Sequence, residues 1–168
     1  MLDFFTGTKR PSSGTAISSP AELKKKIFSI NRSKAPFQII DCASEGVDFI
    51  ADWKIVDAKW YQIFAKAGLH DVFKIYMKFD PVKKEVRAKD KRFTVEWEAG
   101  TPRISLAVSG FSGQTYSKEF GIAYAFTEDM EYGEVYNYRF STAEIKDPIR
   151  KVVTENGWTY KGVVFAEL

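Results

Sequence analysis

The sequence predicts an α+β fold, mainly an antiparallel curved β-sheet or barrel of about nine strands, with about three helices. One observation is a series of short segments between residues 73 and 140 in which apolar and polar residues alternate. Another is a set of three segments with helix start and stop signals, at 19–30, 57–68 and 141–157. The 168 residues fit one domain and can bury a core without metals or disulfides.

The N-terminal segment differs in composition from the rest of the chain. Residues 6–19 are rich in glycine, serine and threonine and show no hydrophobic period. This composition favours a flexible arm. We therefore divide the chain into a flexible N-terminal tail over 1–18 and a single α+β domain over 19–168.

The first helix has a clear start signal. Ser19 is an N-cap residue, Pro20 fits the first helical position, and Glu22 completes a capping box. An apolar stripe at helical spacing then follows, made of Leu23, Ile27 and Ile30.

Two elements are expected between residues 47 and 68. Residues 47–55 alternate as a half-buried strand whose inner face includes Trp53. A short helix then begins at Asp57 and ends at Gly68.

The middle of the chain reads as a meander of short strands joined by compact turns. Two of these segments, 85–89 and 92–98, are expected to be separate short strands, each with its own alternation of apolar and polar residues. The segment 120–126 carries glycine and alanine on one face, which indicates that a helix packs closely over it. The strands predicted for this middle part of the chain are 73–79, 85–89, 92–98, 103–109, 120–126 and 136–140.

A last helix and strand are expected at the C-terminal end. A capping box at 141–144 opens the helix, and Pro148 is expected to mark its true first turn. Asn156 and Gly157 end the helix, and a strand over 158–165 follows.

The motif search gives no catalytic, cofactor-binding or metal-binding constellation. His70 is the only histidine and Cys42 is the only cysteine. The chain therefore cannot form an internal disulfide or a site built from several histidines or cysteines. Cys42 is expected to be buried and inert. We expect no cofactor and favour a non-enzymatic role, with an enzyme that uses a carboxylate, a tyrosine or His70 left open.

The expected location is the cytoplasm, as a default. No apolar run approaches the roughly 18 residues of a transmembrane helix. The first residues lack the charged and apolar regions of a secretory signal.

The leading functional hypothesis is a pocket for a small apolar or amphipathic ligand. Aromatic residues make up 15% of the chain, and tyrosines concentrate in the later strands. A cavity lined by aromatic rings and a few hydroxyl groups is typical of small-molecule sites. The candidate ligand-binding residues are Trp53, Tyr124, Phe126, Tyr136 and Tyr138. A packed core with tyrosine hydroxyls at its rim is the alternative.

The second hypothesis is a surface that binds anionic lipid or nucleic acid. The predicted hairpin at 83–92 carries many cations and only two carboxylates, Glu85 and Asp90. The candidate anion-binding residues are Lys83, Lys84, Arg87, Lys89, Lys91 and Arg92. The alternative is that these lysines have a structural role, because charged side chains on an edge strand prevent edge-to-edge aggregation. A scaffolding role and homo-oligomerisation stay open.

Most of the chain outside the tail resembles a family of uncharacterised bacterial proteins of similar length. The resemblance covers 36–68, 73–102 and 120–165 and is strongest in ADWKIVDAKWYQIFAKAGL, FTEDMEYGEVYNYRFSTAEIKDP and GWTYKGVVF. It implies a free-standing bacterial domain and carries over no activity and no catalytic residues. Two fold analogies remain open, a helix-grip fold and a tubby-like or pleckstrin-like barrel, and neither implies a function.

Overall fold

The fold is described from a computed structural model. The structure describes residues 6–32, 35, 37–54, 71–98, 101–106, 112–113, 118–126, 132–164 and 168. Side chains are described for these residues except 71, 101–106, 112–113, 118–126 and 132–144. The described part contains helices α2 (Pro20–Phe28) and α4 (Thr142–Glu155) and a short 3₁₀ turn, η1 (Ala43–Glu45). Its strands are β1 (Phe37–Asp41), β2 (Phe49–Trp53), β3 (Asp71–Asp80), β4 (Glu85–Glu98), β5 (Thr101–Leu106), β6 (Ser112–Gly113), β7 (Lys118–Phe126), β8 (Tyr132–Ser141) and β9 (Thr159–Gly162).

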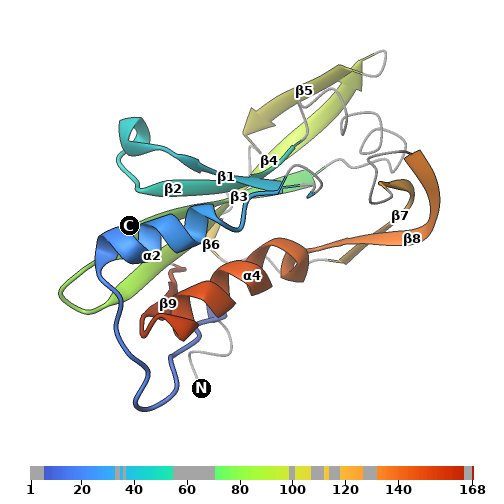
Figure 1. Ribbon diagram of the computed structural model, residues 1–168. Coiled ribbons are helices and arrows are strands. Elements are labelled where there is room, and N and C mark those ends of the chain that lie inside the picture. Colours follow the sequence, from blue (N-terminus) through green and yellow to red (C-terminus); the bar gives the residue numbers. More distant parts are fainter. Residues whose placement is uncertain are drawn as a thin grey trace.

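The strands form one main sheet and a separate ribbon (Figure 1). Strands β1 to β5 follow one another in antiparallel order, while β6 and β9 also pair with β4. Strand β9 runs parallel to β4, so the sheet is mixed. Strands β7 and β8 form a two-stranded ribbon that leads into α4.

The chain is thus α+β, but the described sheet is open rather than a barrel, because β1 and β5 end its main path without pairing. The sheet is mainly antiparallel, as expected, and β9 is the one described strand that pairs in parallel. The chain between β4 and β9 contains β5 to β8 and α4, so the two strands are joined by the long connection that parallel pairing requires.

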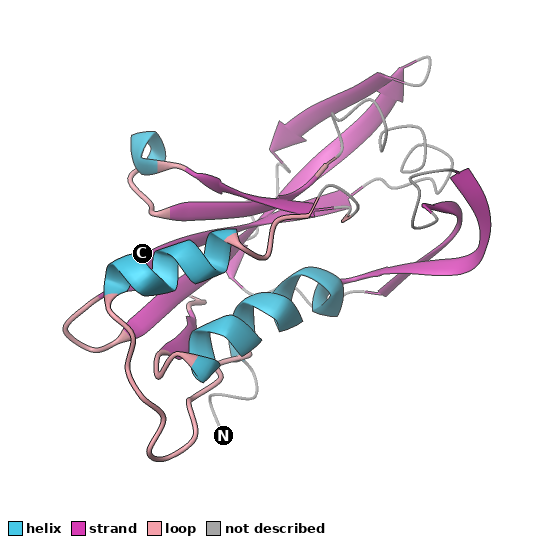
Figure 2. Cartoon of the chain, in the orientation of Figure 1, coloured by secondary structure: helices cyan, strands magenta, loops and turns pink. Residues whose placement is uncertain are grey.

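Both α-helices lie on the same face of the main sheet (Figures 1 and 2). Leu23 and Ile27 of α2, and Ile145, Ile149 and Val153 of α4, are fully buried against it. The sheet contributes alternate residues to this core, among them Phe37, Ile39, Phe49, Ala51, Ile75, Met77, Val86 and Ala88. The opposite face of β3, β4 and β9 is called the outer face below.

Helix α2 confirms the capping box. The Glu22 backbone N–H donates to Ser19 Oγ at 3.2 Å, and the Ser19 N–H donates to Glu22 Oε2 at 3.0 Å. Proline occupies the first helical position, so the local sequence alone sets where this helix begins.

Strand β4 is one continuous strand, so the expectation of two strands at 85–89 and 92–98 is wrong. Its register with β3 runs without a bulge from Glu85 to Thr94. The buried apolar residues change from even to odd positions along the strand. The first half buries Val86 and Ala88 on the side that faces the helices, and the second half buries Val95 on the opposite side. Between them, the buried Asp90 faces the helices, where Lys146 of α4 neutralises it.

Helix α4 begins at Thr142, so the expectation that Pro148 marks its first turn is wrong. The proline lies inside the helix, where it removes one backbone hydrogen bond. The expected end is confirmed, because Gly157 adopts a left-handed φ of 77° directly after Asn156. The helix expected over 57–68 lies outside the described residues. Among the described helices, none is long and apolar enough to cross a membrane.

The described part of the N-terminal segment lies along β9 (Figure 1). Lys9 and Tyr160 exchange backbone hydrogen bonds of 2.9 and 2.8 Å. The Gly162 N–H donates to Thr8 Oγ1, and the Trp158 indole N–H donates to the Ser18 carbonyl. The mobility expected for residues 1–18 stays a prediction, but residues 8, 9 and 18 have defined partners.

Candidate functional site

The outer face of the sheet gathers cations from three adjacent strands. Register pairs Lys78 with Arg87, and Arg87 with Lys161, in one row across β3, β4 and β9. Residues paired in a ladder project to the same side, so each row brings its side chains together. The cationic residues at these positions, called the basic face below, are Lys74, Lys78, Arg87, Lys89, Lys91 and Lys161.

Aromatic rings hold two of these ammonium groups in place. Lys91 Nζ lies 4.2 Å from the centroid of the Tyr76 ring, and Lys74 Nζ lies 5.0 Å from that of Phe93. Such contacts fix a flexible lysine without neutralising it. The basic face is therefore partly preorganised.

Carboxylates border the basic face. Asp52 lies 4.0 Å from Lys74, and Glu45 hydrogen-bonds the Tyr76 side chain. Burial, followed by the charge of Glu45, raises the pKa of Tyr76 to about 12, so this hydroxyl stays neutral at physiological pH. At the hairpin end, Asp80 and Glu85 face each other. Asp80 also accepts the backbone N–H groups of Val82 and Lys83 in the turn.

The six predicted anion-binding residues do not form one group. Arg87, Lys89 and Lys91 belong to the basic face. Arg92 pairs with Phe73 and so lies on the other face of the strand. Lys83 and Lys84 lie in the turn before β4, where the Lys84 ammonium sits 5.4 Å from the centroid of the Trp158 ring.

Sequence reasoning missed half of the basic face. Lys74 and Lys78 occupy polar positions in the predicted strand 73–79, and Lys161 occupies a polar position in the predicted last strand. The sequence therefore indicated that all three are on a polar face of a strand. The compact turn at 81–84 joins 73–79 directly to β4, so Lys74 and Lys78 could have been grouped with the hairpin from the sequence. Nothing local indicates that the last strand flanks β4, so only pairing information could have added Lys161.

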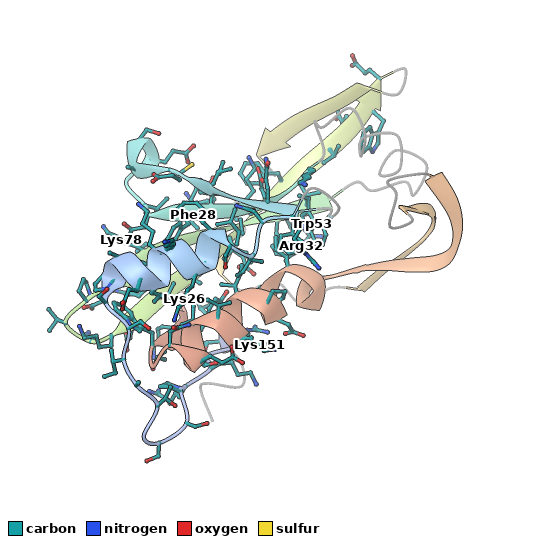
Figure 3. All side chains as sticks on the ribbon, in the orientation of Figure 1. Lys26, Phe28, Arg32, Trp53, Lys78 and Lys151 are labelled. Carbon is teal, nitrogen blue, oxygen red and sulfur yellow. The ribbon has the colours of Figure 1, made fainter. Side chains whose placement is uncertain are left out.

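The five predicted aromatic ligand-binding residues are divided between two sheets. Trp53 ends β2, is buried, and packs edge-to-face against Phe37 and Phe73 at ring distances of 6.4 and 6.1 Å (Figure 3). The other four lie on the β7–β8 ribbon, with their side chains outside the described set: Tyr124, Phe126, Tyr136 and Tyr138. Trp53 is thus a core residue here, and the aromatic pocket stays a prediction.

Cys42 differs from its expected place. It follows β1 at the start of η1 and is half-buried rather than buried. Burial, followed by the charges of Glu45 and Asp41, raises the pKa of its thiol. A raised pKa lowers the thiolate fraction at neutral pH, so low reactivity is expected despite the partial exposure.

No protein-family model, curated protein or solved structure matches the chain. The resemblance to a bacterial family therefore stays an expectation, and the function has to be argued from the geometry alone.

Proposed function

We propose that this protein is a non-enzymatic module that binds single-stranded nucleic acid on its basic face. The observation that carries the proposal is the alignment of six cationic residues on three adjacent strands, on the side opposite α2 and α4. Polyanion binding draws its affinity from such clustered positive charge.

The spacing of the cations fits a linear polyanion. Arg87, Lys89 and Lys91 occupy alternate positions of β4, so they repeat about every 6.8 Å along the strand. Neighbouring strands add further rows about 4.8 Å to either side. A chain of regularly spaced phosphates can therefore contact several cations at once.

A membrane surface fits the described residues less well. Peripheral membrane proteins commonly add exposed apolar side chains that enter the lipid. The exposed large apolar residues in the described part are Ile17, Ile40 and Val82, at 60%, 38% and 92% exposure. Val82 lies in the turn that joins β3 and β4, and the other two residues lie outside β3, β4 and β9.

The expected binding is weak and tolerant of sequence. Five of the six cations are lysines, which contact phosphate as point charges and do not read base edges. We expect dissociation constants of about 10⁻⁴ to 10⁻⁶ M at physiological salt.

The experiment is a fluorescence-anisotropy titration of a labelled, mixed-sequence single-stranded oligonucleotide. The test variant reverses the charge at Lys78→Glu, Lys89→Glu and Lys161→Glu, one position on each strand. The control reverses two exposed lysines on the helices, Lys25→Glu on α2 and Lys151→Glu on α4. Figure 3 labels Lys151. Duplex DNA and vesicles containing phosphatidylserine are titrated in parallel.

We expect the wild type and the control to bind the single strand and the test variant to lose binding. Equal binding by the test variant would refute the basic face as the site. Binding to the vesicles, but not to the oligonucleotide, would replace the proposed ligand with an anionic membrane.

A further inference from the structure

The main sheet ends at β1, and a side chain bonds the outer edge of this strand. Among the described strands, β1 pairs only with β2. In an antiparallel ladder, alternate residues direct their N–H and C=O groups to the same neighbour. Ile39 directs both groups away from β2, to Asn31 in the segment between α2 and β1. Phe37 and Asp41, each two residues away, direct their backbone groups to the same edge.

Asn31 bonds Ile39 as a neighbouring strand would. The Asn31 Oδ1 accepts the Ile39 N–H at 2.7 Å, and its Nδ2 donates to the Ile39 carbonyl at 2.8 Å. This is the two-bond exchange of a hydrogen-bonded pair between antiparallel strands. The side-chain amide therefore occupies the middle of the edge, at the position where a further strand would pair.

Two contacts hold the segment that carries Asn31. The Asn31 backbone N–H donates to the Phe28 carbonyl at 3.1 Å, which places the residue in the turn after α2. Lys54, directly after β2, donates from Nζ to the Arg32 carbonyl at 3.1 Å. Asn31 and Arg32 are themselves exposed, so this closure of the edge lies at the surface and can open without disturbing the core.

The β1 edge is suited to pairing with a second copy. Ile40 is the one exposed large apolar residue that lies on a strand in the described part of the chain, at 38% exposure. An antiparallel pair of two β1 strands, centred on Ile39, places Ile40 opposite Gln38 of the other copy. Asp41 then lies opposite Phe37, so no like charges face each other. Both copies use the same edge, so the pairing closes as a two-fold dimer.

We propose that the β1 edge is a strand-pairing surface for a second copy of this chain, and that Asn31 holds it closed in this structure. Exposed strand edges offer backbone groups to other chains, and native proteins block them in several ways. Asn31 blocks this edge by supplying the hydrogen bonds of the missing strand. The surface shares no residue with the basic face, so it is independent of the proposed function.

The test is the molar mass of Asn31→Ala, measured by light scattering over a range of protein concentrations. Asn31→Ser is a second variant, because its shorter side chain cannot span both backbone groups of Ile39. The matched control is Arg32→Ala, which changes the next exposed side chain and leaves Asn31 in place. A double variant, Asn31→Ala with Ile40→Lys, adds a positive charge to the opened edge, and such charges oppose edge pairing.

We expect the wild type and Arg32→Ala to keep a constant mass, and both Asn31 variants to rise toward twice that mass as the concentration increases. Ile40→Lys should reverse the rise. Amide hydrogen exchange at Ile39 in Asn31→Ala should be fast in dilute solution and slow at high concentration, because the other copy then bonds this N–H.

A constant mass in the Asn31 variants would overturn the proposal. Association that Ile40→Lys does not reverse, or that leaves Ile39 exchange fast, would also overturn it, because the copies would then meet through another surface. The wild type gives a test that needs no variant. Fast exchange of its Ile39 amide would show that Asn31 does not close the edge.

Discussion

Lys146 and Asp90 form a fully buried ion pair, 2.6 Å from Nζ to Oδ2, that joins α4 to the centre of β4. The pair occupies a position that continues the apolar face of Val86 and Ala88. Burial lowers the pKa of Lys146, and the charge of Asp90 opposes this effect. We expect the pair to fix the register of α4 over the sheet, because any sliding of the helix would separate the two charges.

Removing one partner of this pair should be strongly destabilising. Asp90→Val and Lys146→Met each leave a buried charge without its counter-ion, for which we expect a loss of about 3 to 5 kcal/mol. The double variant replaces both charges with apolar groups and should recover most of that loss. Chemical denaturation of the four proteins gives the coupling energy, and additive losses would contradict this role.

The capping box should give α2 a pH-dependent contribution to stability. Hydrogen bonds from the backbone and hydroxyl of Ser19 lower the pKa of Glu22. The folded pKa then lies below the unfolded one, so this contribution is present at neutral pH. It is lost as the pH falls from the ordinary glutamate pKa, about 4.3, toward the folded value.

Unfolding free energies measured across this acid range should therefore fall less steeply for Glu22→Gln than for the wild type. The main causes are hydrogen bonds, so the difference should persist in high salt. Identical acid slopes would show that the capping box has no such effect. Ser19→Ala should cost about 1 kcal/mol at neutral pH.

The docking of the N-terminal segment should depend on the contact between Thr8 and Gly162. Thr8→Val removes the acceptor of the Gly162 N–H, a buried hydrogen bond of 3.0 Å. Gly162→Ala places a methyl group against the Thr6 carbonyl, so the segment would have to move. We expect both variants to speed amide hydrogen exchange at Lys9, whose N–H bonds the Tyr160 carbonyl. Unchanged exchange at Lys9 would contradict a docked segment.

The Cys42 thiol should react slowly for a half-buried cysteine. Its raised pKa keeps the thiolate fraction low at neutral pH, so alkylation by iodoacetamide should be slower than in the unfolded chain. The difference should narrow as the pH rises through the folded pKa. Equal rates at neutral pH would show that burial and the neighbouring carboxylates do not control this thiol.

The sequence predicted elements whose signals are local. Ser19, Pro20 and Glu22 specify the start of α2, and Gly157 specifies the end of α4, because each signal acts within a few residues. The continuity of β4 escaped prediction because its buried face changes sides at Asp90, and the compensating Lys146 lies 56 residues away. The parallel pairing of β9 with β4 escaped for the same reason, since strand order depends on contacts between distant segments.

The candidate site was also predicted where its signals are local and missed where it depends on contacts between distant segments. The density of lysines around β4 was evident from the sequence, and three of the six predicted cations do lie on the basic face. Arg92 was wrongly grouped because β4 continues without a break, so its even position points to the helix side. Trp53 packs against Phe37 and Phe73, as the alternative of a packed aromatic core describes, and the ligand pocket stays a prediction.

The most direct test of the central claim is the salt dependence of oligonucleotide binding. For a single strand, the slope of log K against log[salt] is about −0.7 per phosphate contact. Contacts by most of the basic face should therefore give the wild type a slope of about −3 to −4. The triple variant Lys78→Gln, Lys89→Gln and Lys161→Gln should flatten it by about 2. A wild-type slope near zero, or a slope unchanged in the triple variant, would contradict binding at the basic face.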